Sequence, residues 1–119
     1  MNNHLPPQLF DRSTPHDRRD ALFGGQGTVR VWALLAAPAL PFTAVLACEL
    51  EPGASVGVHV QQEYPELVIC ISGRGHVAVG GVASEFCAGK VVELPHGQTL
   101  AIDNRASAEP LRYLIIKAS

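Results

Sequence analysis

Short runs in which apolar residues alternate with polar ones occupy most of the chain after residue 27. Glycine- and proline-containing turns separate these runs at intervals of about ten residues, which is typical of an all-β sandwich or barrel. No stretch repeats its apolar residues with a helical period over the length of a helix. The runs expected to form strands are TVRVWALLA, FTAVLACEL, SVGVHVQQ, ELVICIS, GHVAVG, KVVELP, TLAIDN and LRYLIIKA.

The alternation within two of these runs predicts which side chains face the interior. In the run from 42 to 50, the Glu49 side chain is expected to point outward. In the run from 55 to 62, three valines are expected to share one face that needs a core. His59 and Gln61 then share the opposite, more polar face. A polar inner face of this kind predicts that the barrel encloses a cavity.

The size of the chain, 119 residues, predicts one domain with one core. Residues 1–23 are polar and show no periodicity, so we expect an extended N-terminal arm there and a barrel domain over 24–119. Exposed strand edges invite pairing with another chain. We therefore expect a homodimer in which the arm crosses to the partner.

The composition of the chain indicates which kinds of partner and which cellular compartment to expect. Charged residues are only 17% of the chain, the net charge is -2 and there is no basic cluster, which argues against nucleic-acid binding. The apolar segment 31–50 has the length of a membrane span, but Pro38 and Pro41 divide it, so two strands are expected and no membrane segment. Three widely spaced cysteines and an N-terminus without an apolar signal core indicate a cytoplasmic protein with reduced thiols.

The stretch from Gly53 to Gly73 resembles the first motif of the cupin family, G-x5-H-x-H-x3,4-E-x6-G. His59 and Glu66 stand at the positions of the first histidine and the glutamate, and Gln61 replaces the second histidine. The resemblance implies a double-stranded β-helix, or jelly-roll barrel, over roughly residues 24–118.

A second stretch, beginning at Gly89, resembles the second cupin motif, G-x5-P-x-G-x2-H-x3-N. Pro95, Gly97 and Asn104 are in register, and Leu100 replaces the histidine. The glycines and prolines have structural reasons, since they permit tight turns and stop strands.

In metal-binding cupins the corresponding four side chains converge on an ion, so the resemblance implies a degenerate metal site here. Only His59 and Glu66 are retained; an amide such as Gln61 is a poor donor to transition metals, and Leu100 cannot bind one. No cofactor is certain. A divalent ion such as iron, manganese, nickel or zinc would have to be held by His59, Gln61 and Glu66.

A few polar side chains on an apolar floor are typical of a small-molecule site. The expected ligand is a small sugar, polyol or organic acid. The residues expected to line the pocket are His59, Gln61, Glu66, Cys70, Leu100 and Ile102.

His59 and Glu66 can also be interpreted as a buried acid–base pair that works without metal. A buried carboxylate needs a partner, which a nearby imidazolium could supply, or Arg30 or Arg112 if either points inward. Such a pair could transfer a proton, or it could be a relic in which the two side chains only satisfy each other.

Three functional hypotheses follow, and the sequence leaves open whether the protein is an enzyme. The first is a small-molecule-binding cupin with a degenerate metal site. The second is a metal-dependent oxygenase, isomerase or lyase that uses the reduced ligand set. The third is an accessory subunit whose barrel serves only as a dimerisation scaffold.

Overall fold

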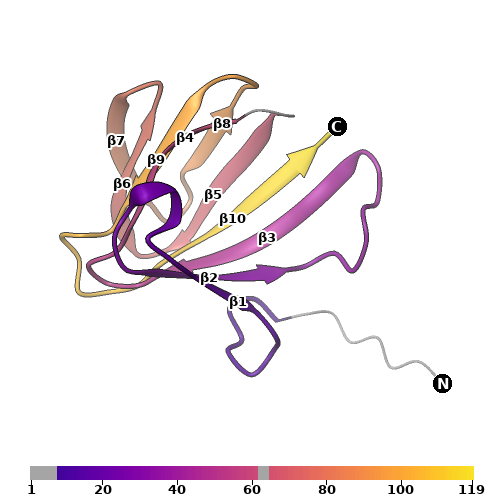
Figure 1. Ribbon diagram of the computed structural model, residues 1–119, viewed down its shortest axis with the longest axis horizontal. Coiled ribbons are helices and arrows are strands. Elements are labelled where there is room, and N and C mark those ends of the chain that lie inside the picture. The colour runs from indigo at the N-terminus through magenta and orange to yellow at the C-terminus, as the bar shows by residue number, and fades with distance from the viewer. Residues whose placement is uncertain (1–7, 62–64) are drawn as a thin grey trace.

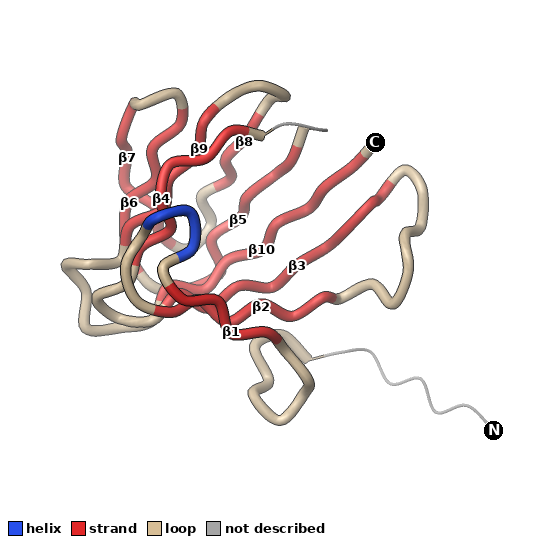
Figure 2. Tube along the Cα trace, viewed as in Figure 1, coloured by secondary structure: helices blue, strands red, loops and turns tan. Residues whose placement is uncertain are grey.

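The computed structural model describes residues 8–61 and 65–119, which form two antiparallel sheets facing each other (Figures 1 and 2). This architecture confirms the all-β, double-stranded β-helix prediction. The elements of the described chain are β1 (Asp17–Asp20), η1 (Leu22–Gly24), β2 (Thr28–Ala33), β3 (Phe42–Leu50), β4 (Ser55–Val60), β5 (Glu66–Ser72), β6 (Arg74–Val79), β7 (Val82–Cys87), β8 (Val91–Leu94), β9 (Thr99–Asp103) and β10 (Leu111–Ala118).

The larger sheet has six strands in the order β1-β2-β3-β10-β5-β8, and the smaller has four in the order β4-β9-β6-β7. The C-terminal strand β10 therefore lies inside the larger sheet, between β3 and β5 (Figure 1). Strands distant in sequence are neighbours in both sheets, so much of the core is built from long-range contacts.

All eight runs predicted from the sequence form strands, and two further strands, β1 and β7, were not predicted. The segment 31–50 contributes to β2 and β3, which pair antiparallel as the proline turn indicated. Within the described residues, no helix is long and apolar enough to cross a membrane.

The closed end of the barrel is filled by side chains from both sheets. Phe86 from the smaller sheet meets Tyr113 from the larger with ring centroids 6.0 Å apart at an interplanar angle of 62°, and both side chains are buried. Leu50, Leu94 and Leu111 are also almost fully buried. Burial of such side chains stabilises the fold by roughly 1.5–3 kcal/mol each before entropy is counted.

Two cupin-motif positions have structural roles at this end. Gly73 has φ of +91°, and a Cβ there would lie 2.4 Å from the carbonyl oxygen of Pro110, so the turn after β5 accepts only glycine without a backbone shift. The buried Asn104 amide nitrogen lies within hydrogen-bonding distance of the carbonyl oxygens of Leu50, Glu51 and Glu109, at 3.2, 3.1 and 2.8 Å. The Asn104 side chain therefore connects the end of β3 with the segment that precedes β10.

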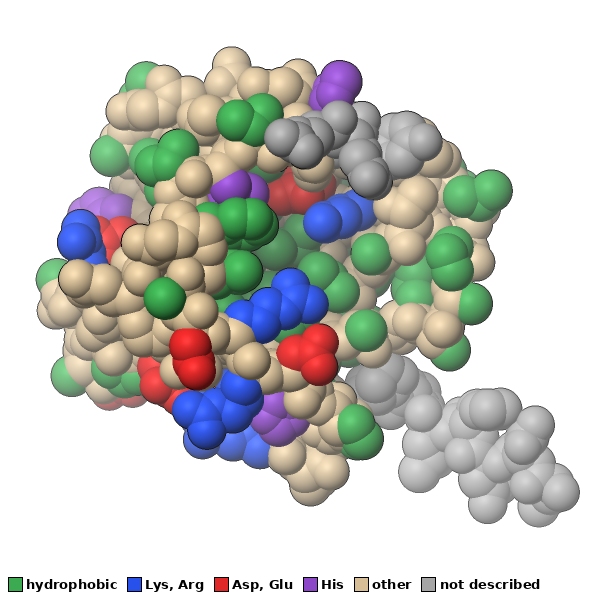
Figure 3. All heavy atoms as spheres, in the orientation of Figure 1, with side chains coloured by type: hydrophobic (Ala, Val, Ile, Leu, Met, Phe, Trp, Pro, Cys, Tyr) green, Lys and Arg blue, Asp and Glu red, His purple; other side chains and the backbone are tan. Residues whose placement is uncertain are grey.

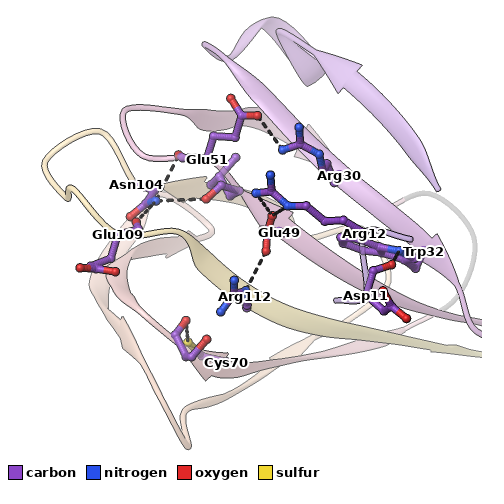
Figure 4. Close-up of polar contacts among 12 residues, drawn as sticks. Asp11, Arg12, Arg30, Trp32, Glu49, Glu51, Cys70, Asn104, Glu109 and Arg112 are labelled. Carbon is purple, nitrogen blue, oxygen red and sulfur yellow. Dashed lines mark hydrogen bonds and ion pairs between the residues drawn. The ribbon is translucent and has the colours of Figure 1, made fainter. Parts of the chain in front are cut away.

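The Glu49 side chain points to the outer face of the larger sheet, as the alternation along β3 predicted. It is nevertheless fully buried there, because other side chains cover it. The guanidinium of Arg12 donates from Nη2 at 2.5 Å and from Nε at 3.1 Å, and Arg112 Nε donates at 2.7 Å (Figure 4). Burial alone would raise the pKa of Glu49, but the hydrogen bonds from Arg112 and Arg12 outweigh it and lower the pKa.

The N-terminal segment covers Glu49 and the neighbouring part of the sheet. Trp32 of β2 donates from its indole nitrogen to the Asp11 carbonyl at 2.9 Å (Figure 4). The Trp32 ring contacts Phe10 edge-on at 6.0 Å and His16 at 4.6 Å between centroids. Residues 8–20 of the predicted arm thus pack on the chain's own sheet, and β1 extends that sheet beside β2. That the arm reaches a partner subunit stays a prediction.

We expect Glu49→Gln to lower the free energy of unfolding by about 2–3 kcal/mol, because it removes the charge that two guanidinium groups share at a buried site. Urea denaturation at neutral pH measures the change. Glu85→Gln is the matched control: Glu85 pairs with Arg74 at 3.2 Å on the surface, where an ion pair contributes only about 0–1 kcal/mol. Equal losses in the two variants would contradict this role of Glu49.

Candidate ligand-binding cavity

A cavity of about 520 Å³ opens between the two sheets, directly against the packed core. Its volume lies within the ~300–1,000 Å³ range of small-molecule pockets. The space-filling view shows a hollow with an apolar floor and basic, acidic and histidine side chains around it (Figure 3). Apolar side chains from both sheets form the floor: Val29, Val31, Leu46, Val56, Ile102 and Ile115.

A β-bulge in β4 directs His59 into this cavity. Val56 pairs with Ile102 and His59 pairs with Leu100, so β4 has one extra residue between these pairs. Both Val56 and His59 consequently face inward, whereas Val58 is 69% exposed. The expectation that the three valines share one core-facing side is therefore wrong, because the bulge breaks the alternation on which it rested.

The His59 ring is held by two contacts. Its Nδ1 lies 3.0 Å from the Gly57 carbonyl oxygen, and its face stacks on the Phe23 ring at 4.0 Å between centroids and 12° between planes. A carbonyl can only accept a hydrogen bond, so Nδ1 carries the hydrogen in this contact. In the neutral ring the lone pair then belongs to Nε2, which is available to a ligand.

Phe23 reaches His59 because η1 lies directly against β4. A Cβ on Gly57 would be 1.9 Å from the Phe23 carbonyl oxygen, so only glycine allows this approach. Phe23 itself has φ of +52°, an uncommon conformation for a residue with a side chain. Gly57 therefore serves the packing of the N-terminal segment rather than the polar lining.

Glu66, at the start of β5, is the buried carboxylate of the cavity, with 5% exposure. The Gln61 amide nitrogen donates a short hydrogen bond to Glu66 Oε2, and Lys117 Nζ lies 4.0 Å from the same oxygen. Burial raises the pKa of Glu66, while Lys117, His59 and the Gln61 hydrogen bond oppose that rise without cancelling it.

Of the cationic partners expected for Glu66, His59 acts on its carboxylate but neither arginine does. Arg30 pairs with Glu51 at 2.8 Å and Arg112 pairs with Glu49, so neither supplies the charge inside the cavity. Lys117 supplies it, because it shares the inward face of β10 with Tyr113 and Ile115.

The structure brings four of the six predicted pocket residues together: His59, Gln61, Glu66 and Ile102 all line the cavity. Leu100 pairs with His59 but is buried in the core and is not part of the lining. Cys70 also lies in the core, with its Sγ 3.6 Å from the Ser72 carbonyl oxygen. Burial and the neighbouring Cys87 raise the pKa of Cys70 to about 11, which makes its thiol a weak nucleophile at neutral pH.

Among the lining residues that sequence reasoning missed, Arg19, Leu22, Phe23 and Lys117 contribute most to the character of the cavity. Strand alternation could have found Lys117, since it lies two and four residues beyond Ile115 and Tyr113 on β10. The other three belong to the segment interpreted as an arm, where no hydrophobic pattern signalled a contact with the barrel.

Comparison with known proteins places the chain in a family. Residues 46–117 match the cupin domain, so the chain belongs to the cupin family. A predicted oxalate decarboxylase from Thermotoga maritima is similar at 25% identity and TM-score 0.79, over 87% of this chain and 92% of that one. A cupin 2 conserved barrel domain protein from Salinispora arenicola is similar at 27% identity and TM-score 0.72, over 98% and 91%. No curated protein matches the sequence.

The donors in the cavity do not suit a tightly bound transition metal, which usually takes three or four protein ligands. His59 offers Nε2, but Glu66 already accepts from Gln61 and has the Lys117 ammonium beside it. The amide nitrogen, not the amide oxygen, of Gln61 is directed at Glu66. Among residues 8–61 and 65–119, no group of three or more His, Cys, Asp or Glu side chains is placed to hold an ion.

The raised pKa of Glu66 predicts a pH-dependent effect of Glu66→Gln. The folded state holds the Glu66 proton more tightly than the unfolded chain, so the wild-type free energy of unfolding falls as pH rises from the ordinary glutamate pKa through the raised one. Gln is neutral throughout. We expect the free energy of unfolding of the variant, relative to wild type, to increase as the pH rises above the ordinary glutamate pKa of about 4.3.

Urea titrations at several pH values measure this difference. Glu93→Gln, at an exposed position of β8, is the control, and its difference from wild type should stay nearly constant. A Glu66→Gln difference that shrinks or stays flat over the same range would show that burial does not dominate at Glu66.

Proposed function

We propose that this protein is a small-molecule-binding cupin with a degenerate metal site. One observation carries the proposal: His59, Gln61 and Glu66 converge on one side of a cavity of about 520 Å³ whose floor is apolar. That combination orients a ligand through a few polar contacts and gains affinity by burying its apolar part. The ligand is a small organic molecule with one or two hydrogen-bonding groups.

A thermal-shift screen of small organic compounds tests the binding function. A compound at about 100 times its Kd stabilises the folded state by about 2.7 kcal/mol, which raises Tm by several degrees in a domain of this size. Gln61→Ala should reduce the shift, because Gln61 lines the cavity. Gln98→Ala, an exposed position outside the lining, should not. Shifts in Tm that are the same in wild type and in Gln61→Ala, or no shift with any compound, would favour the scaffold hypothesis.

The alternative of a metal-dependent enzyme requires an ion held by His59, Gln61 and Glu66. We expect untagged protein that has been incubated with iron, manganese, nickel or zinc and then desalted to retain far less than one equivalent. Elemental analysis of wild type and His59→Ala provides the measurement. Near-stoichiometric metal that disappears in His59→Ala would overturn the degenerate-site proposal.

The similarity to a predicted oxalate decarboxylase is not a reason to assign that reaction to this chain. Oxalate is a small dianion without a hydrocarbon part. The cavity here is larger than such a molecule requires, and most of its floor consists of branched apolar side chains.

We further propose a homodimer formed through the outer face of the larger sheet. The N-terminal segment covers this face over β2 and β3, but the neighbouring part over β10, β5 and β8 is apolar and partly exposed. Cross-strand pairs such as Leu67 with Ile116 and Ile69 with Leu114 make it continuous. The residues of this face are Leu67, Ile69, Ile71, Val91, Leu114 and Ile116.

We expect Ile71→Lys to convert the dimer into a monomer, because Ile71 is 39% exposed on this face and a buried lysine charge would oppose association. Sedimentation velocity over a range of concentrations measures the change. Val58→Lys, on the smaller sheet at 69% exposure, is the control and should leave the dimer intact. A wild-type monomer at all concentrations, or an Ile71→Lys dimer, would refute this interface.

The cytoplasmic location also stays a proposal. Its support is that Cys48, Cys70 and Cys87 are all free thiols, which is usual in a reducing compartment.

A further inference from the structure

The arginine and lysine side chains in the cavity come from two elements that lie outside the two cupin motifs. Arg19 belongs to β1, and Lys117 belongs to the end of β10. Both side chains line the cavity. Their positive charges oppose the effect of burial on the pKa of Cys48, which is also a lining residue. Two cations thus face the same cavity.

The pairing of β1 with β2 explains why Arg19 turns inward. Arg19 is opposite Val29, whose side chain lies on the cavity floor, whereas Arg18 is opposite Arg30 on the outer face. Adjacent arginines of one strand therefore have opposite environments. Leu22 and Phe23 follow on η1 and complete a wall of the cavity that the N-terminal segment provides.

The negative charges near these cations only partly balance them. Asp17 lies 3.6 Å from Arg19, but its side chain is 74% exposed, where ion pairs are weak. Glu66 is the one carboxylate among the described lining residues, and the Gln61 amide and Lys117, 4.0 Å away, share it. An incoming anion would therefore meet an Arg19 whose charge is only weakly paired and a Lys117 whose one carboxylate partner is shared with an amide.

The remainder of the lining selects against ligands rich in hydroxyl groups. The floor residues offer no side-chain donors or acceptors, so hydroxyl groups placed against them would lose water without replacement. A hydrocarbon chain or ring gains free energy from the same surface. A sugar or polyol thus fits poorly, whereas an acid with an apolar body matches both parts of the cavity.

We propose that the cavity binds a monoanionic amphipathic organic acid, with its carboxylate at Arg19 and Lys117 and its hydrocarbon part on the floor. The inference rests on the proposed binding function and specifies its ligand class. It also makes the N-terminal segment part of the binding site, because Arg19, Leu22 and Phe23 come from it.

Isothermal titration calorimetry with octanoate, 1-octanol and sorbitol tests the ligand class on the full chain. We expect octanoate to bind at least about ten-fold more tightly than octanol, since a charge-assisted hydrogen bond contributes roughly that much. Added salt should weaken octanoate binding and leave octanol binding nearly unchanged. Sorbitol should not bind. Equal affinities for octanoate and octanol, or preferential binding of sorbitol, would overturn the inference.

Arg19→Gln and Lys117→Gln should each weaken octanoate binding about ten-fold or more and change octanol binding less than about two-fold. Arg18→Gln is the matched control, because it removes the same charge from the same strand on the other face. Octanoate binding that both pocket variants leave intact, or that Arg18→Gln weakens equally, would overturn the assignment. If either pocket variant fails to fold, the wild-type octanoate-to-octanol ratio and its salt dependence still decide the matter.

Different results would refute the proposed ligand class and the proposed binding function. If octanoate does not bind but other compounds raise Tm in a manner that depends on Gln61, the ligand class is wrong and the binding function stands. If no compound raises Tm, the binding function itself is wrong.

Discussion

The register of β10 between β3 and β5 is the constraint on which both buried charge groups depend. It places Arg112 opposite Glu49 on the outer face and Lys117 opposite Glu66 on the inner face. Because side chains alternate along a strand, a shift of one residue would turn Lys117 away from Glu66 and direct Arg112 into the cavity. The register of this one strand therefore positions two ion pairs. The first, between Arg112 and Glu49, lies where the N-terminal segment is attached, and the second, between Lys117 and Glu66, lies inside the site.

The N-terminal segment connects the outer face with the cavity. Arg12 binds Glu49 from outside the sheet, and five residues later the chain enters β1, which directs Arg19 inward. η1 then lies on β4 and stacks Phe23 on His59. Stabilising contacts and site residues thus belong to one continuous segment, so its attachment to the sheet is also a condition for a complete cavity.

The chemistry of the cavity follows from what replaces the metal ligands of the family. Where a cluster of donors would attract a cation, the described residues instead pair one carboxylate with an amide and an ammonium group. A second cation, Arg19, faces the same space. Under the proposed function, Gln61 and Leu100 remove two metal donors while Arg19 and Lys117, from other elements, add positive charge. Together these differences favour anions over metal ions, while the fold remains that of a cupin.

Alternation of apolar residues and the position of turn residues were sufficient to predict eight strands, the glycine turn at Gly73 and an all-β fold, because they depend on local chemistry. The resemblance to the cupin motifs added the double-stranded β-helix and the grouping of His59, Gln61, Glu66 and Ile102. The rest depended on contacts between distant segments. β1 is made of charged residues and has no hydrophobic signal, so only its pairing with β2 identifies it as a strand. The bulge that turns Val58 outward, the burial of Glu49 under Arg12, and the presence of Arg19 and Lys117 in one cavity likewise arise only when the sheets assemble, since each depends on a neighbour that sequence spacing does not specify.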